Sequence, residues 1–468
     1  MAEALPVERL RAYLQELKPE ARAMLLAELE RSLARGGEVP GGALLLEELR
    51  RTVRVAPAAS PPEAPRIATP ARLFFAPLEP FLVDHDEAPP SGRIARAAID
   101  PLWQWISRDL VPGDAKAYGD ELERSLADEK TVARLVRAFQ DLVVNRIQEA
   151  LAAIKDEHAR RRFAAQVGTP RALDDLGAVL GVLKARDALA LIASRLPSHI
   201  RNIGDEQLEN VKTLLDSPIA RHPDIFVYAL VVVMKRLTAP WQLVRLAVKA
   251  ADSDKAQRIK ETPYAAAVTV VLGEIACAVA EFRHALRRGE IAAVGGVLKD
   301  IHDAVRLLRT EMDLAGDSPW ARELAALRAA VSALVKGEIE TVPGRVRRLL
   351  RPRAVKDVIP GSALDATDVA ETEALIEFVN TCRNYASELA TNEVTLRVHS
   401  ELENFLDTGT PLLLESLRAA GSSDRAFRVS QVEAAVRFAG KVFGPSYATL
   451  LAKAAEVAQN GERKAAKA

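Results

Sequence analysis

Cysteine is scarce in this chain, which has only Cys277 and Cys382 among its 468 residues. The two lie far apart in stretches of helical periodicity, and neither has the spacing of a metal-binding or redox motif. Because stable disulfides are typical of oxidising compartments, the sequence predicts a reduced, cytoplasmic protein rather than a disulfide-rich secreted one. The N-terminus also lacks the basic stretch and apolar core of a signal peptide.

Aromatic residues and excess charge are lacking as well. Aromatic residues make up 5% of the chain, and 64 basic residues balance 64 acidic ones. So few aromatic residues suit helices packed through leucine, alanine and valine, and no segment alternates with the two-residue period of a strand. A balanced charge disfavours a nucleic-acid coat or a polybasic membrane anchor. We therefore expect no general binding of nucleic acid.

Uninterrupted apolar runs long enough to span a bilayer are also absent. Residues 225–234 are ten consecutive apolar residues, whereas a membrane helix needs about 20. The stretch 263–280 is longer, but Glu274 interrupts it. A helix that is apolar on all sides must be covered by other helices. Both stretches are therefore predicted to be buried core helices around which the fold is built, and no integral membrane protein is expected.

Catalytic and metal-binding motifs are missing too. The chain has no phosphate-binding glycine loop, no nucleophile elbow and no paired cysteine spacing. Glu281 and His284 form one Glu-x-x-His on a helix predicted to face the core, but a di-iron bundle needs two such pairs. His399 and Glu403, one helical turn apart, could hold a metal or form a surface pair. We predict no catalytic residue, no metal and no cofactor.

What the chain does contain is helical periodicity along most of its length. Residues 93–260 read as short helices, such as 171–183 and 185–196, which resemble stacked helical hairpins. Residues 261–460 read as longer helices of an antiparallel bundle. Within that region, residues 366–407 contain no Gly or Pro and form either one long helix or two. The predicted fold is all-α: irregular, solenoid-like hairpins followed by a long-helix bundle, with a disordered tail at 461–468.

The N-terminal part is predicted to be separate from this body. Residues 1–54 form a helical arm with a leucine stripe, too small to bury much surface alone, so it should dock on the body or on another chain. Residues 55–92 combine a Pro-rich linker with a phenylalanine-rich strap at residues 73–82. The strap either lies along the body and buries its own side chains or inserts into a partner's groove. The candidate residues for that second role are Phe74, Phe75, Leu78, Phe81 and Leu82.

A basic segment at residues 345–356 is the clearest electrostatic feature. It holds six positive charges and no acid, and its partner-binding candidates are Arg345, Arg347, Arg348, Arg351 and Arg353. Anionic lipid, RNA or an acidic protein could dock there. However, residues 357–415 contain twelve acidic residues against Arg383 and Arg397. We therefore expect the two segments to neutralise each other in part within the fold.

These features together favour a non-enzymatic cytoplasmic scaffold or adaptor. It would bind protein partners, or associate with itself, through the N-terminal arm and the basic segment. An all-α enzyme without a local motif is one alternative, because a pocket of convergent histidine and carboxylate side chains leaves no sequence signature. Peripheral binding of nucleic acid or of an anionic membrane through the basic segment is the other.

Overall fold

The computed structural model describes residues 69–84, 88–168, 170–314 and 318–465, together with scattered positions between 10 and 49. Among these residues it contains 18 α-helices and one pair of two-residue strands, so the predicted all-α fold is confirmed. Most of the predicted Pro-rich linker lies outside the described residues. Packing divides the chain into two compact units: unit 1 comprises residues 1–57, 282–302 and 326–468, and unit 2 comprises residues 58–281 and 303–325.

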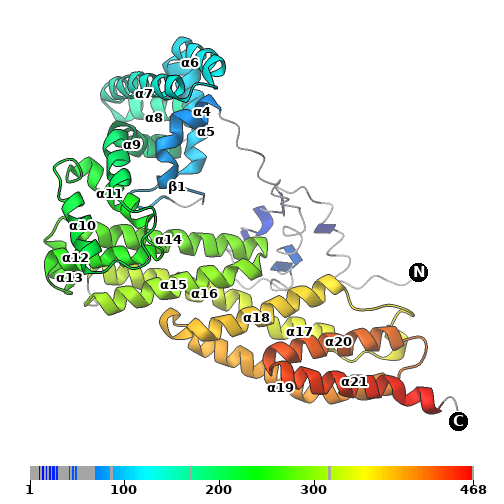
Figure 1. Ribbon diagram of the computed structural model, residues 1–468. Helices are drawn as coiled ribbons and strands as arrows, with labels where there is room; N and C mark the ends of the chain where they lie inside the picture. Colours follow the sequence, from blue (N-terminus) through cyan, green and yellow to red (C-terminus); the bar gives the residue numbers. More distant parts are fainter. Residues whose placement is uncertain are drawn as a thin grey trace. The chain divides into compact units, whose positions relative to one another are not determined.

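Unit 2 packs helices that are neighbours in the sequence and also brings together elements that are far apart in it (Figure 1). Its two strands pair in parallel, with Leu82 opposite Ile94. In chain order its elements are α4 (Pro70–Phe75), η1 (Ala76–Phe81), β1 (Leu82–Val83), β2 (Ile94–Ala95), η2 (Arg96–Ala98), α5 (Ile99–Trp105), the π-helical turn η3 (Ile106–Leu110), α6 (Pro112–Ser125), α7 (Glu129–Ala152), α8 (Glu157–Val167), α9 (Pro170–Arg195), α10 (Asp205–Leu215), α11 (Pro223–Met234), η4 (Pro240–Leu243), α12 (Val244–Ala251) and α13 (Ala256–Lys260).

Three long helices contribute residues to both units: α14 (Ala265–Arg288), α15 (Ile291–Glu311) and α16 (Pro319–Ile339). The predicted domain limits at residues 54, 92 and 260 stay predictions. Unit 1 then continues with α17 (Val342–Leu350), η5 (Val355–Asp357), α18 (Ala366–Leu389), α19 (Asn392–Arg418), α20 (Arg425–Val442) and α21 (Pro445–Ala465). Figure 1 shows α18 to α21 side by side as a helical bundle. The expected disordered tail overlaps α21, which extends to Ala465.

The core of unit 2 forms where α9 packs on α11. The apolar run of α11 is buried from Ala229 to Met234, as predicted from its composition. The prediction of two short helices at 171–183 and 185–196 was wrong, because α9 is one helix of 26 residues. Its buried side chains continue at helical spacing from Leu176 through Leu183 to Ile192. No residue at the expected joint breaks that periodicity, so the helix continues.

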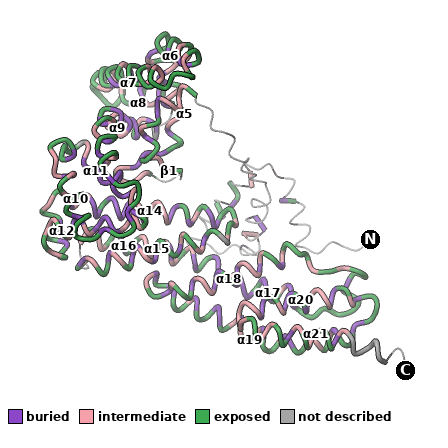
Figure 2. The backbone as a smooth tube through the Cα atoms, in the orientation of Figure 1, coloured by how far each residue is buried: buried purple, intermediate pink, exposed green. Residues whose placement is uncertain are grey.

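The strap lies against the body of unit 2, where Figure 2 colours the backbone by the burial of each residue. The aromatic side chains of the strap are buried. Phe74, Leu78 and Phe81 are at most 1% exposed. The Phe81 ring packs edge-on against Tyr228 of α11, with 5.2 Å between ring centres. Gln140 Nε2 donates a hydrogen bond of 2.7 Å to the Phe74 carbonyl and so satisfies a buried acceptor. The strap therefore acts as part of the core.

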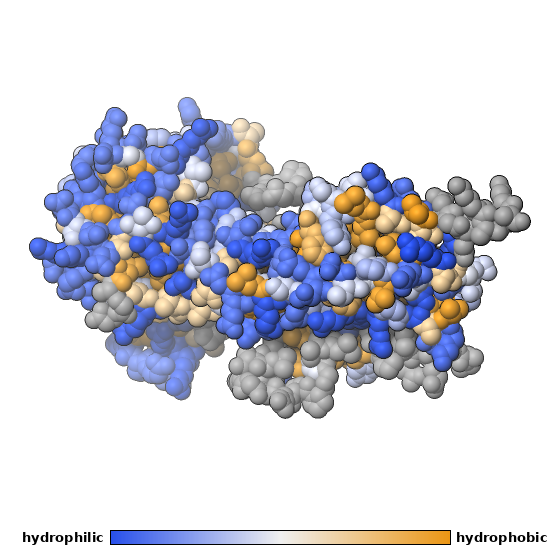
Figure 3. Space-filling view, turned by 90° about the horizontal axis from the view of Figure 1, so that it is seen from below, coloured by the Kyte–Doolittle hydropathy of each residue, from blue (hydrophilic) through white to orange (hydrophobic). Residues whose placement is uncertain are grey.

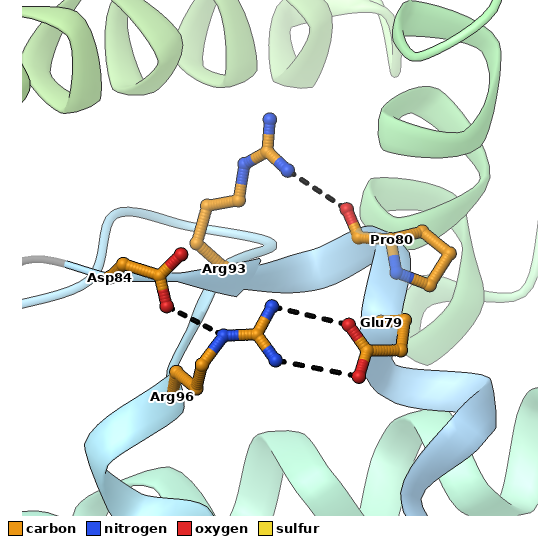
Figure 4. A network of polar contacts seen from close by, with 5 residues as sticks. All are labelled: Glu79, Pro80, Asp84, Arg93 and Arg96. Atoms are coloured by element: carbon orange, nitrogen blue, oxygen red, sulfur yellow. Dashed lines mark hydrogen bonds and ion pairs between the residues drawn. The ribbon is translucent and has the colours of Figure 1, made fainter. Parts of the chain in front are cut away.

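Two arginines after the strap fasten it at its C-terminal end (Figure 4). Arg93 Nη1 donates 3.0 Å to the Pro80 carbonyl, and its other terminal nitrogen pairs with Glu274 of α14. Arg96 donates to both carboxylate oxygens of Glu79, at 3.4 and 3.1 Å, and through Nε to Asp84 at 2.5 Å. Glu274 thus serves as the counter-charge of a buried arginine.

Glycine is required where this connection turns. Gly92 has φ +78°, a conformation that side chains with a Cβ rarely adopt, and a Cβ there would lie 2.9 Å from Val227 Cγ1. A Cβ on Gly273 of α14 would lie equally close to Pro90. The turn from Pro90 to Arg93 therefore fits closely against both α11 and α14.

Among the described helices, α14 is the one that is long and apolar enough to cross a membrane, judged by length and composition alone. In its most apolar window 56% of the residues are buried inside the structure. Such burial is typical of the core helix of a soluble protein. Its Glu274 is paired with Arg93 rather than exposed to lipid. The interpretation of this stretch as a core helix therefore accounts for its apolar composition.

Residues 366–407 fold as two helices, which resolves the alternative that the sequence leaves open. Helix α18 ends where Ala390 adopts the left-handed conformation, with φ 54°, and Thr391 precedes α19. The hydroxyl of Ser332 on α16 donates 3.2 Å to the Ala390 carbonyl. This joint turns the chain back, so that α18 and α19 pack against each other in unit 1.

The described positions of the N-terminal arm contain a small leucine cluster. Leu14, Leu26, Leu29 and Leu49 are buried together, with further leucines packed around them. Leu25, a member of the predicted stripe, is instead 46% exposed. The described members of this cluster all come from the arm, and its docking on the body or on another chain stays a prediction.

Candidate functional site

The structure separates the basic segment into a helical half and a loop half. In α17, Arg345 is buried and Nη1 lies 3.3 Å from Glu371 Oε2 of α18. Arg347 is half-exposed and Nη2 lies 3.1 Å from Glu401 Oε2 of α19. Both partners belong to the acidic stretch 357–415, so these contacts provide the partial neutralisation expected from the sequence.

The loop half, residues 351–360, has a different character, and we call it the basic loop. Helix α17 ends at Leu350 because Pro352 follows, and Arg351 takes the extended conformation common before proline. The three cations and one acid of this loop are exposed: Arg351, Arg353, Lys356 and Asp357. Two large apolar side chains are exposed beside them, Val355 at 59% and Ile359 at 71%.

Two buried side chains of α20 hold the start of the basic loop. Gln431 Nε2 donates to the carbonyl oxygens of Leu349 and Arg351, each at 3.0 Å. Arg428 donates through Nη2 to the Arg353 carbonyl and through Nε, at 3.2 Å, to Asp424. Arg428, Gln431 and Asp424 are each at most 5% exposed. Such a network fixes the backbone that it contacts, since each of its polar groups is costly to leave without a partner.

Further contacts anchor the rest of the loop. Arg353 stacks over the Phe427 ring at 5.0 Å from its centre, and Val358 is buried as a plug between the exposed Val355 and Ile359. Beyond the loop, the Leu364 amide donates 2.9 Å to Ser430 Oγ. The exposed side chains therefore project from a backbone that α20 fixes on both sides, which is the preorganised geometry of a binding loop.

The strap candidates lie elsewhere and do not join this loop. Phe74, Phe75, Leu78 and Phe81 are in the core of unit 2, and Leu82 is half-buried in β1. A partner could reach these side chains only if the strap left the body. The structure thus agrees with the strap alternative in which the segment buries its own side chains.

The residues considered for metal binding do not form a cluster. This part of α14 faces the core as predicted, with Phe282 and Ala285 buried, but Glu281 and His284 are themselves exposed. Within the described ranges no three His, Cys, Asp or Glu side chains gather as metal ligands would. His399 is buried, with Nδ1 3.3 Å from Glu403 and Nε2 2.5 Å from Arg383 Nη1.

The two cysteines are not activated. Burial raises the pKa of the Cys277 thiol to about 11, and nearby Glu274 adds to the effect. Burial also raises the pKa of Cys382 far above its ordinary range. Because the thiolate is the reactive form, neither cysteine has the environment of a nucleophile.

A second set of exposed apolar side chains lies on α19 and α21 of unit 1: Leu396, Leu412, Leu450 and Val457, all more than half exposed. Leu450 and Val457 are seven residues apart and so share one side of α21. In Figure 3, hydrophobic residues interrupt the hydrophilic surface over the right-hand half, which carries the C-terminal helices. Scattered singly, such residues are ordinary on a soluble protein, so they rank below the basic loop as a candidate.

Comparison of the chain with protein-family models, with curated proteins and with solved structures finds no match in any of the three. The candidate site therefore rests on its own geometry.

Sequence reasoning identified Arg351 and Arg353 but missed what surrounds them. Val355 and Ile359 were visible as apolar residues between Pro352 and Pro360. Arg428 and Gln431 also left a signal, since they interrupt an apolar face of α20 that contains Phe427, Val432 and Phe438. Polar residues on a buried helix face indicate an internal network. Their partners, the carbonyl oxygens of a loop about 80 residues earlier, carry no sequence signal.

Proposed function

We propose that this protein is a non-enzymatic helical scaffold or adaptor that binds a protein partner through the basic loop. One observation carries the proposal. The fold places buried Arg428 and Gln431 under a loop whose exposed side chains combine three cations with two large apolar groups. Apolar contacts surrounded by charges are the usual composition of a protein interface, in which the apolar centre supplies affinity and the charged rim supplies orientation.

The chemistry of the loop favours a protein over a membrane as its partner. Two aliphatic side chains and a net charge of about +2 give weak attraction to an anionic bilayer, at roughly 1 kcal/mol for each cation near the surface. The loop also lacks the tryptophan or tyrosine typical of the membrane interface. An acidic protein surface with an apolar hollow would complement both sets of side chains.

The N-terminal arm supplies a second candidate surface in this proposal. Among its described positions Tyr13 is 60% exposed and Met24 is 74% exposed. Large apolar side chains at such exposure are suited to contact with another chain, including a second copy of this one. A cytoplasmic location is also part of the proposal and rests on the sparse cysteines.

The proposal is tested by quantitative affinity purification from the native cell with the parent chain and with the double variant Val355→Asp, Ile359→Asp. Both side chains are exposed, so the variant should melt like the parent. At least one protein captured by the parent should be depleted with the variant and should then bind the purified parent directly. The control is Leu412→Asp, which changes a leucine of α19 that is 53% exposed and should leave capture unchanged.

Two outcomes would overturn the proposal. In the first, the set of captured proteins is the same for parent and double variant. In the second, the purified parent floats with vesicles that contain phosphatidylserine, loses that binding in the double variant, and captures no protein. That result would show that the basic loop binds an anionic membrane instead of a protein.

A further inference from the structure

A polar hollow of about 490 Å³ lies in unit 1, where the C-terminal half of α18 meets the joint between α20 and α21. Its lining residues are Asn380, Arg383, Asn384, Lys441, Val442, Phe443 and Gly444. These include two cationic side chains, two side-chain amides and no carboxylate. The hollow lies at the C-terminal end of α20, whereas Arg428 and Gln431, which hold the basic loop, lie toward its N-terminal end. A ligand in the hollow is therefore independent of the function proposed above.

Arg383 is held in place at the edge of this hollow by His399. Its Nη1 lies 2.5 Å from His399 Nε2. Since a guanidinium can only donate, Nε2 accepts and the ring proton is on Nδ1, which faces Glu403 at 3.3 Å. The chain Glu403–His399–Arg383 therefore orients the guanidinium. A guanidinium has five N–H donors, so one bond to His399 leaves a fork of donors for another acceptor.

The opposite wall is fixed as well. Asn380 Nδ2 donates 2.8 Å to the Lys441 carbonyl, which ties the end of α20 to α18. The Lys441 ammonium lies 3.1 Å from Glu377 of α18 and retains further donors. Asn384, one helical turn beyond Asn380, is exposed and lines the hollow.

The backbone adds to the positive potential of the wall. Gly444 lines the hollow at φ +96° and immediately precedes α21, which begins at Pro445. The first turn of a helix carries a partial positive charge from its amide groups. Beside the start of α21, the remaining donors of Arg383 and the Asn384 amide thus favour negative charge, whereas Lys441 shares its charge with Glu377.

We propose that this hollow is a binding site for an oxyanion, either a carboxylate or a phosphate group of a small molecule. Arg383 supplies charge and two parallel donors to the anion, and Asn384 supplies a neutral donor at the rim. Val442 and Phe443 provide an apolar wall for the remainder of the ligand. His399 and Glu403 act as positioning residues through Arg383.

The test uses isothermal titration calorimetry of the full chain at low ionic strength and pH 7.5, with inorganic phosphate and citrate as separate probes. Phosphate and citrate distinguish the two oxyanion classes. At least one should bind saturably with one site per chain. Arg383→Gln should weaken that binding about tenfold or more, which is the effect of removing a charge-assisted pair of hydrogen bonds. Asn384→Leu should weaken it by a smaller factor.

Arg418→Gln is the matched control, because it removes the same charge from an exposed arginine of unit 1 at the end of α19. It should bind like the parent. The inference fails if neither probe saturates, if Arg383→Gln binds like the parent, or if Arg418→Gln loses as much affinity. If Arg383→Gln lowers the melting temperature, its loss of affinity could come from unfolding, and Asn384→Leu then provides the test. Unchanged affinity of Asn384→Leu for the probe also overturns the site.

Discussion

The guanidinium carbon of Arg353 lies 5.0 Å from the centre of the Phe427 ring. Arg353 belongs to the basic loop and Phe427 to α20, so this cation–π contact joins an exposed charge to a buried ring of the helix that supports the loop. An arginine that stacks on an aromatic ring keeps its charge exposed while its plane is held. The contact shows how one residue can serve both the packing of the loop and its proposed binding.

Removal of the buried Arg428 side chain, which pairs with Asp424 and holds the basic loop, should destabilise unit 1. Arg428→Met leaves Asp424 buried without its counter-charge, and we expect the free energy of unfolding to fall by about 3 kcal/mol. Chemical denaturation by urea measures this. Arg437 is on the same helix as Arg428 and forms an ion pair with Glu373 of α18. Arg437→Met should cost less than about 1 kcal/mol, because the arginine is at the surface. If both variants lower the free energy of unfolding equally, the contacts of Arg428 do not form a buried network.

The two arginines of α17 should differ in the same way. Arg345 is buried at 7% side-chain exposure, whereas Arg347 is 53% exposed. Arg345→Glu places two carboxylates together in a buried position and should cost about 3 kcal/mol or more. Arg347→Glu places a carboxylate opposite Glu401 at the solvent-exposed surface, so the free energy of unfolding should fall by about 1 kcal/mol or less. Thermal melts at low ionic strength check both, and a tolerant Arg345→Glu would contradict the partial neutralisation.

The tight turn before β2 should not accept a side chain. Gly92→Ala combines the strain of φ +78° with a close approach to Val227, so we expect a loss of about 2 kcal/mol. Gly113→Ala is the control, since it lies in helix α6 with no atom within 4 Å of the added Cβ. Alanine favours helix more than glycine, so that variant should gain up to about 1 kcal/mol. Denaturant midpoints of the three proteins give the comparison.

His399 should make stability depend on pH. Burial lowers the pKa of His399 below its ordinary value of 6.5, and the charge of Arg383 lowers it further, against a smaller opposing effect of Glu403. The unfolded chain therefore takes up this proton first as the pH falls. The free energy of unfolding should be highest above pH 6.5 and decrease from there toward the pKa of the folded state.

The measurement for this prediction is the difference between the parent and His399→Gln, because carboxylates also titrate at lower pH. Glutamine carries no titrating proton and can still accept from Arg383. The variant should lose less stability than the parent between pH 7 and pH 5. Identical pH profiles would mean that the histidine is not held neutral in the fold.

The sequence by itself determined the helical nature of the fold and the burial of its apolar helices. The periodicity of α11 and α14 depends only on residue order, and a helix apolar on all sides has to be covered. The sequence also indicated that the charges of residues 345–356 would meet the acids that follow. It could not show that α9 is a single helix. The pattern fits one continuous helix, because no residue at the expected joint breaks it, but it fits two short helices of a hairpin equally well.

Only the tertiary structure decided which arginines are used internally and which are exposed. Arg345 and Arg353 have the same chemistry in the sequence, yet one meets Glu371 in the interior and the other stacks on Phe427 at the surface. The hollow beside Arg383 has the same origin, because its lining comes from α18 and from the α20–α21 joint, and the His399 that holds Arg383 comes from α19. Local periodicity fixes helices, whereas the position of one helix on another depends on packing that no local pattern records.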